Sequence, residues 1–330
     1  MYNVDKGLKK TIIQLNRILS TKYGDVLSLD KKTFRDFIHE NVGTITKIQR
    51  LNRENISLCA QKGGILGVDG SNNRMGGAYP HFVEIYQGLA LSSIEGNRPI
   101  FKTDFYTPLY PEEGDNPLED LSEGEESIRK RKLSTIEVEA ALEGIKQFNP
   151  YAVFMDGSLI RYNIECSDIW MELREECEKR NIVIIGIIED IKTSIIGKLL
   201  SEHGLLEREG HFYDRELLYG LLEYGEMILI DEGVTKKSDE GFSTLFMRSS
   251  QSPAVIGIDI LDSQREYLEY MARLILSLTP EDGRGIPLWL DIVDREVRIP
   301  NQMIKGLLES YLDREILELF FVPERDKRTL

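Results

Sequence analysis

The order of its apolar segments constrains the fold of this chain more than any other feature of the sequence. Three apolar segments joined by short links come first, at residues 65–68, 81–92 and 99–109. Short links favour antiparallel pairing of successive strands, because antiparallel neighbours need only a tight connection. The sheet is therefore predicted to begin with three antiparallel strands.

Helical and apolar segments alternate after these three strands. A helix is predicted over residues 127–148, a strand over 152–155, a helix over 167–180 and a strand over 182–188, with a further helix over 193–203. The strand at 182–188 is almost continuously apolar, which is typical of a strand covered on both faces. Three antiparallel strands followed by strand–helix crossovers is the element order of the ribonuclease-H-like fold. We therefore expect an α/β protein with a ribonuclease-H-like mixed sheet.

The remaining segments are interpreted as additions to this sheet. Residues 1–60 are predicted to be an N-terminal helical region, and residues 61–330 the ribonuclease-H-like domain with C-terminal elaborations. Residues 110–126 are acidic, contain no Lys or Arg and carry Pro, Gly and Asn, so they are predicted to form a loop. The elaborations comprise predicted helices at 215–224, 264–278 and 300–319 and predicted strands at 227–230, 243–248, 254–261 and 287–299.

The composition excludes several classes of protein. Hydrophobic residues make up 41% and charged residues 29%, which is ordinary for a globular chain. The sequence contains no run of eighteen apolar residues and begins with no apolar signal region, so neither a membrane span nor a secretory signal is expected. The three cysteines form no CxxC pair, which favours reduced thiols in a cytoplasmic protein.

The charge is unevenly distributed along the chain. The net charge of −15 argues against a protein that coats nucleic acid by itself. Residues 1–62, however, hold twelve Lys and Arg against six Asp and Glu, a net charge of +6, which leaves −21 for the rest. Such a basic arm on an acidic body can contact phosphates, or its charges can simply face the solvent.

Two buried strands are each followed by the same three residues. Asp69-Gly70-Ser71 follows the apolar run 65–68, and Asp156-Gly157-Ser158 follows the run 152–155. A carboxylate directly after a buried strand lies at the carboxyl edge of the sheet, where sites in α/β proteins are built. If the two strands are neighbours, Asp69 and Asp156 converge, and a divalent cation between them relieves their repulsion. Each triplet alone has an ordinary explanation as a turn.

The predicted helix between these strands offers a third carboxylate. Glu137 shares its helix face with apolar residues, where an acid needs a partner, whereas Glu139 falls on a more polar face. Geometry favours Glu137, but both Glu137 and Glu139 stay candidates as metal ligand or catalytic acid.

An acid in the C-terminal part of the chain and a possible phosphate-binding pair complete the candidate site. In the predicted strand 287–299, alternation places Asp294 in register with an apolar face, as expected for an acid that completes a two-metal site. Its alternative role is an ion pair with Arg295 or Arg298. Lys192 and Ser194 follow the strand 182–188 at a helix entry, where they can hold a substrate phosphate, although Ser194 can equally be a helix cap.

Several enzyme classes lack their motifs here. The four histidines show no metal-ligand spacing, and the sequence has no Walker A motif, no GxGxxG and no nucleophile elbow. This argues against a P-loop NTPase, a dinucleotide enzyme and an α/β-hydrolase.

The ordered set of motifs resembles the NurA family, the nuclease partner of the HerA DNA translocase in double-strand-break end processing. The resemblance rests on Ile65–Ser71, Glu137–Glu139, Val153–Leu159, Gly186–Ser194 and Asp294–Arg298, which occur in family order over most of the chain. Relatives often carry Lys-Arg-Ser at the strand exit, where this chain reads Ile191-Lys192-Thr193-Ser194. Some relatives also use a late Tyr or His that has no evident counterpart here.

The resemblance implies a manganese-dependent deoxyribonuclease, with Mg²⁺ as the alternative cation. It implies Asp69, the helix Glu and Asp156 as metal ligands and Asp294 as a late metal or substrate residue. It also implies DNA as substrate, a HerA-type hexameric ATPase as partner and a homodimer. Two rival functions are an ATPase of the actin and sugar-kinase class, which would need a second glycine-rich phosphate loop, and a non-catalytic adaptor of a DNA translocase.

Overall fold

The computed structural model describes residues 6–110, 121–206 and 212–321. The described residues form one nine-stranded mixed sheet in the order β1-β7-β8-β9-β6-β5-β2-β3-β4. The strands are β1 (Gly43–Lys47), β2 (Ile65–Gly76), β3 (Phe82–Ser92), β4 (Ile100–Tyr106), β5 (Ala152–Asp156), β6 (Val183–Ile188), β7 (Glu226–Ile230), β8 (Phe242–Met247) and β9 (Ile256–Leu261).

Helices cover both faces of this sheet. On one face lie α4 (Leu121–Phe148), α5 (Leu159–Glu165) and α6 (Ser167–Arg180), which share a core with β2, β5 and β6. The same face continues over β7 and β8 as α2 (Lys31–Asn41), α7 (Ile195–Glu202) and α8 (Asp214–Leu217). On the other face lie α3 (Arg53–Gln61), α10 (Leu268–Leu278) and α11 (Leu288–Val297). The central strands are therefore covered on both faces, as the apolar run at 182–188 predicts.

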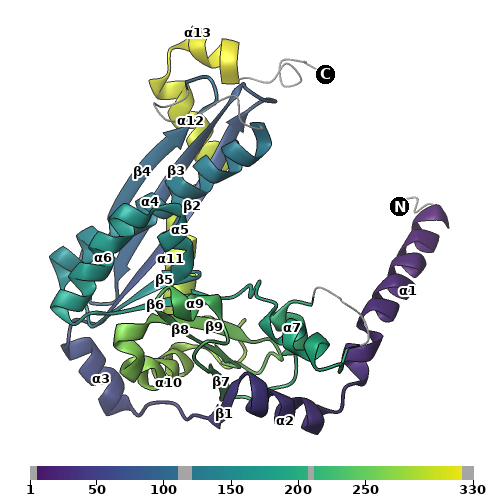
Figure 1. The fold of residues 1–330 in the computed structure, drawn as a ribbon. Helices are drawn as coiled ribbons and strands as arrows, with labels where there is room; N and C mark the ends of the chain where they lie inside the picture. The colour runs from purple at the N-terminus through teal and green to yellow at the C-terminus, as the bar shows by residue number, and fades with distance from the viewer. Residues whose placement is uncertain (1–5, 111–120, 207–211, 322–330) are drawn as a thin grey trace.

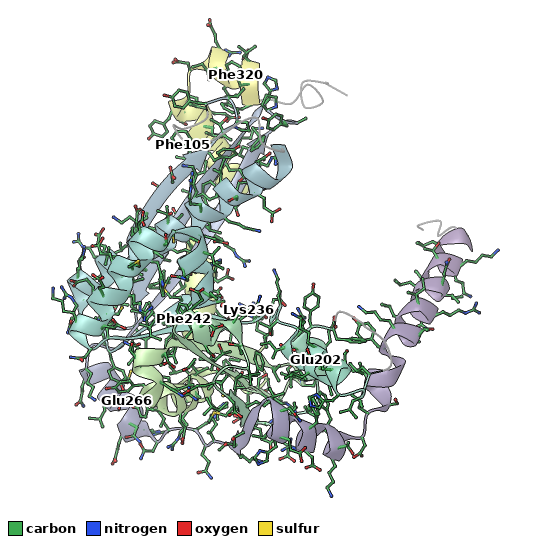
Figure 2. All side chains as sticks on the ribbon, viewed as in Figure 1. Phe105, Glu202, Lys236, Phe242, Glu266 and Phe320 are labelled. Carbon is green, nitrogen blue, oxygen red and sulfur yellow. The ribbon has the colours of Figure 1, made fainter. Side chains whose placement is uncertain are left out.

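The long strands and several helices extend beyond this central body. In Figure 1, β2, β3, β4 and α4 rise from it together with α12 (Asn301–Tyr311) and α13 (Arg314–Ile316), while α1 (Lys6–Ser28) projects from the opposite side. Figure 2 places Phe105 of β4 and Phe320 of the following turn η2 (Leu317–Phe321) at one end of the molecule. Glu266, in the 3-10 helix η1 (Asp262–Tyr267), lies at the other end. The four-residue α9 (Lys236–Asp239) lies near the centre.

The predicted ribonuclease-H-like order is confirmed. Strands β2, β3 and β4 pair antiparallel through short links, and β2, β5 and β6 pair parallel through helical crossovers. The fold is a ribonuclease-H-like mixed sheet with additions at both ends. The helix α4 begins at Leu121, six residues earlier than predicted, and residues 111–120 of the predicted acidic loop lie outside the described residues.

Three predicted elements are wrong. The helix predicted over 215–224 is only the four-residue α8, at Asp214–Leu217. The N-terminal region is not purely helical, because β1 interrupts it and pairs antiparallel with β7 as the edge strand of the sheet. The segment predicted as a strand at 287–299 is the helix α11. Its buried residues Leu290, Val293 and Val297 are spaced three and four apart, so the helical period prevails over the shorter alternating pattern.

No helix in the described ranges is long and apolar enough to cross a membrane. The three cysteines, Cys59, Cys166 and Cys177, are free and buried, as predicted.

Candidate active site

The first Asp-Gly-Ser triplet lies inside a strand. We predicted that it stops a strand, but β2 continues to Gly76 and stays paired with β3 throughout. The side chains beyond Asp69 hold the C-terminal helices instead: Ser71 Oγ donates to Val297 O at 2.7 Å and Asn73 Nδ2 donates to Ile299 O at 2.9 Å. The turn prediction is wrong here because tertiary pairing with β3 outweighs the local preference of these residues.

Gly70 brings a helix close to the sheet. A Cβ at Gly70 would lie 2.6 Å from Glu137 Oε1, and one at its cross-strand partner Gly88 would lie 2.7 Å from Ile136 O. These two glycines therefore let α4 lie directly on the strands. As a result, the carboxylate of Glu137 reaches the strand position next to Asp69.

The second triplet is a turn, as predicted. Asp156 ends β5, and Gly157 has a φ of +115°, a conformation that L side chains rarely adopt. Ser158 makes no cap hydrogen bond to α5; its Oγ donates to the buried Asp259 at 2.5 Å. Asp259 also accepts from Leu159 N at 3.3 Å and is paired with Lys237 at 2.7 Å, so β9 anchors this turn.

Asp69 and Asp156 occupy adjacent positions on neighbouring strands. The parallel pairing of β2 with β5 ends at Val68↔Met155, so these two acids come next on each strand. Leu89, opposite Asp69 on β3, contacts Val293 of α11, which places Asp69 on the α11 face of the sheet. Asp69 is only 7% exposed.

The two helix acids differ in their surroundings. Glu137 is 1% exposed and its carboxylate accepts from Tyr162 Oη at 2.7 Å and pairs with Arg161. Glu139 is half-buried, whereas the charge of Glu137 helps to raise the pKa of Asp69. The geometry therefore places Glu137 at the site.

Asp294 reaches the site from a helix rather than a strand. It lies on α11, is half-buried and accepts from Arg298 Nη2 at 2.7 Å, the ion pair that we considered as its alternative role. Its charge nonetheless raises the pKa values of both Asp69 and Asp156, which places it within electrostatic reach of both.

The structure differs from the prediction at Lys192 and Ser194, the residues predicted to hold a substrate phosphate. Ser194 is the N-cap residue of α7 but makes no side-chain cap bond. The backbone N–H groups of Ile195 and Ile196 donate instead to the buried carboxylate of Asp214, at 3.1 and 2.9 Å. Ser194 therefore has the predicted cap position, but Asp214 supplies the capping hydrogen bonds. Lys192 is exposed, and the anion position at this helix end is already filled by Asp214.

The pKa values of the acidic side chains are raised by burial and by the negative charges of the neighbouring acids. Burial, with the negative charges of Asp156, Glu137 and Asp294 adding to it, raises the pKa of Asp69 to about 8. Burial also raises the pKa of Asp156 to about 6, although Arg161 opposes the shift. Burial raises the pKa of Glu137 against the same arginine. The charges of Asp156, Glu137 and Asp294 thus all act on Asp69.

The donor set suits a hard divalent cation. Asp69 and Asp156 supply buried carboxylate oxygens, the ligands that Mg²⁺ and Mn²⁺ prefer. In the described part of the chain, no three Asp, Glu, His or Cys side chains already stand in metal-binding geometry. Glu137 is engaged by Arg161 and Asp294 by Arg298. Asp69 and Asp156 thus fit a cation directly, and the other two acids fit it once their carboxylates turn from these partners.

Sequence reasoning missed two arginines at the site. Arg161, on α5, contacts Glu137 and donates to Tyr162 Oη at 2.8 Å. Arg284 precedes α11 and lowers the pKa of Asp156. Arg161 could have been noticed because it lies one helical turn beyond the second Asp-Gly-Ser, whereas Arg284 comes from a loop far away in sequence.

Fold and acids together define the class: a ribonuclease-H-like protein with a buried carboxylate site at its central strands. The NurA domain model matches residues 63–299, so the chain belongs to the NurA family of nucleases. A search of curated proteins gave no match.

Several solved structures are similar in fold. Endonuclease V from Bacillus subtilis is 12% identical, with a TM-score of 0.40 over 86% of this chain and 95% of its own. Human endonuclease V is 15% identical, with a TM-score of 0.40 over 84% of this chain and 98% of its own. The Argonaute of Kluyveromyces polysporus, solved with a guide RNA, is 14% identical, with a TM-score of 0.38 over 84% and 32%.

Proposed function

We propose that this chain is a metal-dependent deoxyribonuclease that cuts single strands or duplex ends during double-strand-break repair. The observation that carries the proposal is the adjacency of Asp69 and Asp156 on one sheet face, with Glu137 and Asp294 in electrostatic reach. Such a set of buried acids binds a cation more readily than it stays ionised alone. Mn²⁺, or Mg²⁺ in its place, is the proposed cofactor.

Each residue has a definite task in this proposal. A divalent cation bound by Asp69 and Asp156 supplies Lewis-acid activation of water and neutralises charge that develops on the phosphate. Glu137 completes the ligand set from the helix side once its carboxylate turns from Arg161, and the bond from Tyr162 Oη holds it near the site until then. Asp294 completes it from α11, opposite Glu137.

The test compares matched acid variants. Asp69→Asn, Asp156→Asn and Glu137→Gln are expected to lower cleavage of a single-stranded oligonucleotide with Mn²⁺ by at least about 100-fold. Glu139→Gln and the exposed Asp190→Asn are the controls and should stay within about threefold. Undiminished cleavage by Asp69→Asn would refute the site.

Two other outcomes lead to the rival functions. Isothermal titration of the wild type with Mn²⁺ should reveal binding that Asp156→Asn weakens. ATP turnover without DNA cleavage would favour an ATPase of the actin and sugar-kinase class. Neither cleavage nor Mn²⁺ binding would favour a non-catalytic adaptor.

A HerA-type hexameric ATPase is the proposed partner, and the cytoplasm the proposed location. The region after residue 62 carries a net charge of −21, which repels DNA over most of the surface. A partner that delivers the DNA overcomes this repulsion. We expect cleavage of duplex ends to rise when such an ATPase and ATP are added, and salt to inhibit the isolated chain strongly.

A homodimer is also proposed, and the exposed face of α1 supports it. Leu8, Ile12, Leu15 and Leu19 are each about half exposed, and they are spaced four, three and four residues apart as in a coiled-coil seam. A second copy offers the same stripe, so the two can pair isologously. Ile12→Glu with Leu15→Glu should give a monomer by light scattering, while Lys9→Glu should not.

A further inference from the structure

Arg284 lies in the loop between α10 and α11 and holds two acids at once. Its Nη1 donates to Glu189 Oε2 at 2.5 Å, and its Nε and Nη2 donate to Asp291 Oδ1 at 3.0 and 2.7 Å. The side chain is 46% exposed. Three of the five N–H donors of the guanidinium are used in these bonds, so two stay available on a solvent-accessible group.

The two partners of Arg284 border the acidic site. Glu189 directly follows β6, and Asp156 pairs with Ile187 of that strand. Asp291 lies one helical turn before Asp294 on α11. The guanidinium therefore bridges the end of β6, the strand that pairs with the strand of Asp156, to α11, which carries Asp294. It interacts electrostatically with Asp156 and Asp294.

The loop is fixed so that Arg284 has a defined position. Gly285 has a φ of +100°, and its carbonyl accepts from the buried Ser249 Oγ at 2.5 Å. Nearby, Gln251 N donates to Glu281 O at 2.7 Å. A side chain on an anchored loop and held by two carboxylates loses little freedom on binding a ligand.

Two other cations near Asp156, Arg161 and Lys237, are less accessible than Arg284, whereas the more exposed Arg298 is paired with Asp294. Arg161 also lowers the pKa of Asp156, but it is committed to Glu137 and Tyr162. Lys237 lies with only 12% of its side chain exposed against the fully buried Asp259. Of the two arginines that act on Asp156, Arg284 is the one with the more exposed side chain.

We propose that Arg284 binds a non-bridging oxygen of the phosphodiester that is cleaved, as the phosphate-binding cation of this site. This inference rests on the proposed nuclease function. A guanidinium matches the geometry of phosphate oxygens and stays charged at every working pH. Hydrolysis forms one P–O bond from water and breaks one P–O ester bond. The two protons of the water end on the new phosphomonoester and on the leaving hydroxyl, and Arg284 transfers none.

The experiment uses a neighbouring arginine as its control. Asp190, next to Glu189, pairs with the exposed Arg215 just as Glu189 pairs with Arg284. Arg284→Gln should lower kcat/KM on a single-stranded oligonucleotide by about 100-fold, and Arg284→Lys by less. Arg215→Gln should stay within about threefold. Guanidinium chloride, but not equal sodium chloride, should restore part of the activity of Arg284→Ala.

Two further measurements separate phosphate binding from a structural brace. Mn²⁺ affinity by titration should be no weaker in Arg284→Gln than in wild type, because the lost charge repels the cation, and anisotropy in EDTA should show DNA binding weakened about fivefold or more. Cleavage by Arg284→Gln at the wild-type rate would overturn the inference. A loss of cleavage that accompanies weakened Mn²⁺ binding, and that guanidinium does not restore in Arg284→Ala, would overturn it too. If the wild type cleaves no DNA, the nuclease proposal fails, and the inference is then refuted only if Arg284→Gln and wild type bind DNA equally.

Discussion

The two Asp-Gly-Ser segments have the same letters and different structures. At 69–71 the chain runs straight on as β2, and Gly70 is needed because Glu137 and Leu133 of α4 lie where its side chain would be. At 156–158 the chain turns, and Gly157 is needed because its φ is +115°. Gly70 leaves room for side chains of a neighbouring helix, whereas Gly157 adopts a backbone conformation that other residues rarely adopt.

The serines differ in the same way. Ser71 attaches the end of α11 by donating to a backbone carbonyl, whereas Ser158 donates to the buried carboxylate of Asp259. Only the aspartates serve a common purpose, because each is the position at which a central parallel strand reaches the site. The comparison teaches that two copies of a motif can bring the same residue to equivalent positions while the other two residues are set by different packing.

The largest expected contrast is in the pH dependence of metal-free stability. Burial raises the pKa of Asp69 to about 8 and that of Asp156 to about 6. The folded state then binds more protons than the unfolded state above pH 4, so stability falls as pH rises through that window. In EDTA, the unfolding midpoint of the wild type should drop by more than about 5 °C between pH 4 and 8.

The two aspartates should account for different parts of that drop. Asp69→Asn should remove the part that extends to about pH 8, and Asp156→Asn the part that ends near pH 6. The exposed Asp190→Asn should leave the profile unchanged. A flat wild-type profile would mean that the acids are not buried as a group.

The next contrast is between the two glycines. Gly70→Ala should cost about 1–3 kcal/mol, because the new Cβ overpacks against Glu137 and Leu133. Gly157→Ala should cost a similar amount through backbone strain, because its Cβ would meet only Arg161 at an ordinary 3.6 Å.

Double-mutant cycles distinguish these two causes. Glu137→Ala should reduce the destabilisation caused by Gly70→Ala, with a coupling free energy of about 1 kcal/mol in denaturant unfolding. Arg161→Ala should leave the destabilisation caused by Gly157→Ala unchanged. Equal coupling at both positions would contradict the distinction.

The smallest contrast is between the serines. Ser158→Ala removes a donor from a buried carboxylate and should cost about 2 kcal/mol. Ser71→Ala loses a bond to a neutral carbonyl and should cost about 1 kcal/mol. Thermal unfolding of both variants measures the difference, and a larger cost at Ser71 would reverse the comparison.

The local patterns predicted much of the fold. Short links predicted the antiparallel β2–β4, and the continuous apolar run predicted a covered β6, because both depend on near neighbours in sequence. The strand prediction for 287–299 was wrong because its apolar residues fit both the strand period of two and the helical period of 3.6. Packing against β2 and β3 selects the helix. The strand β1 was missed because its partner β7 is almost two hundred residues away.

The part of the candidate site that depends on the order of strands and helices along the chain was predicted. Asp69, Asp156 and Glu137 stand on elements whose order is visible in the sequence, and these acids do lie together. The role of Asp214 as the cap of α7 and the position of Arg284 were not predicted. Asp214 begins the short helix α8 and Arg284 lies in a loop, and only the folded chain brings each to its partners.

The sequence by itself determined which strands carry the acids, since hydrophobic burial and chain connectivity decide where each strand lies. Tertiary structure alone decided what surrounds the acids. It made one Asp-Gly-Ser a straight strand and the other a turn, because a strand continues wherever a partner satisfies its backbone hydrogen bonds and ends where none does. It also set the charge balance of the site, because burial and the charges of Arg161 and of Arg284, which is far away in sequence, act on Asp156 through space.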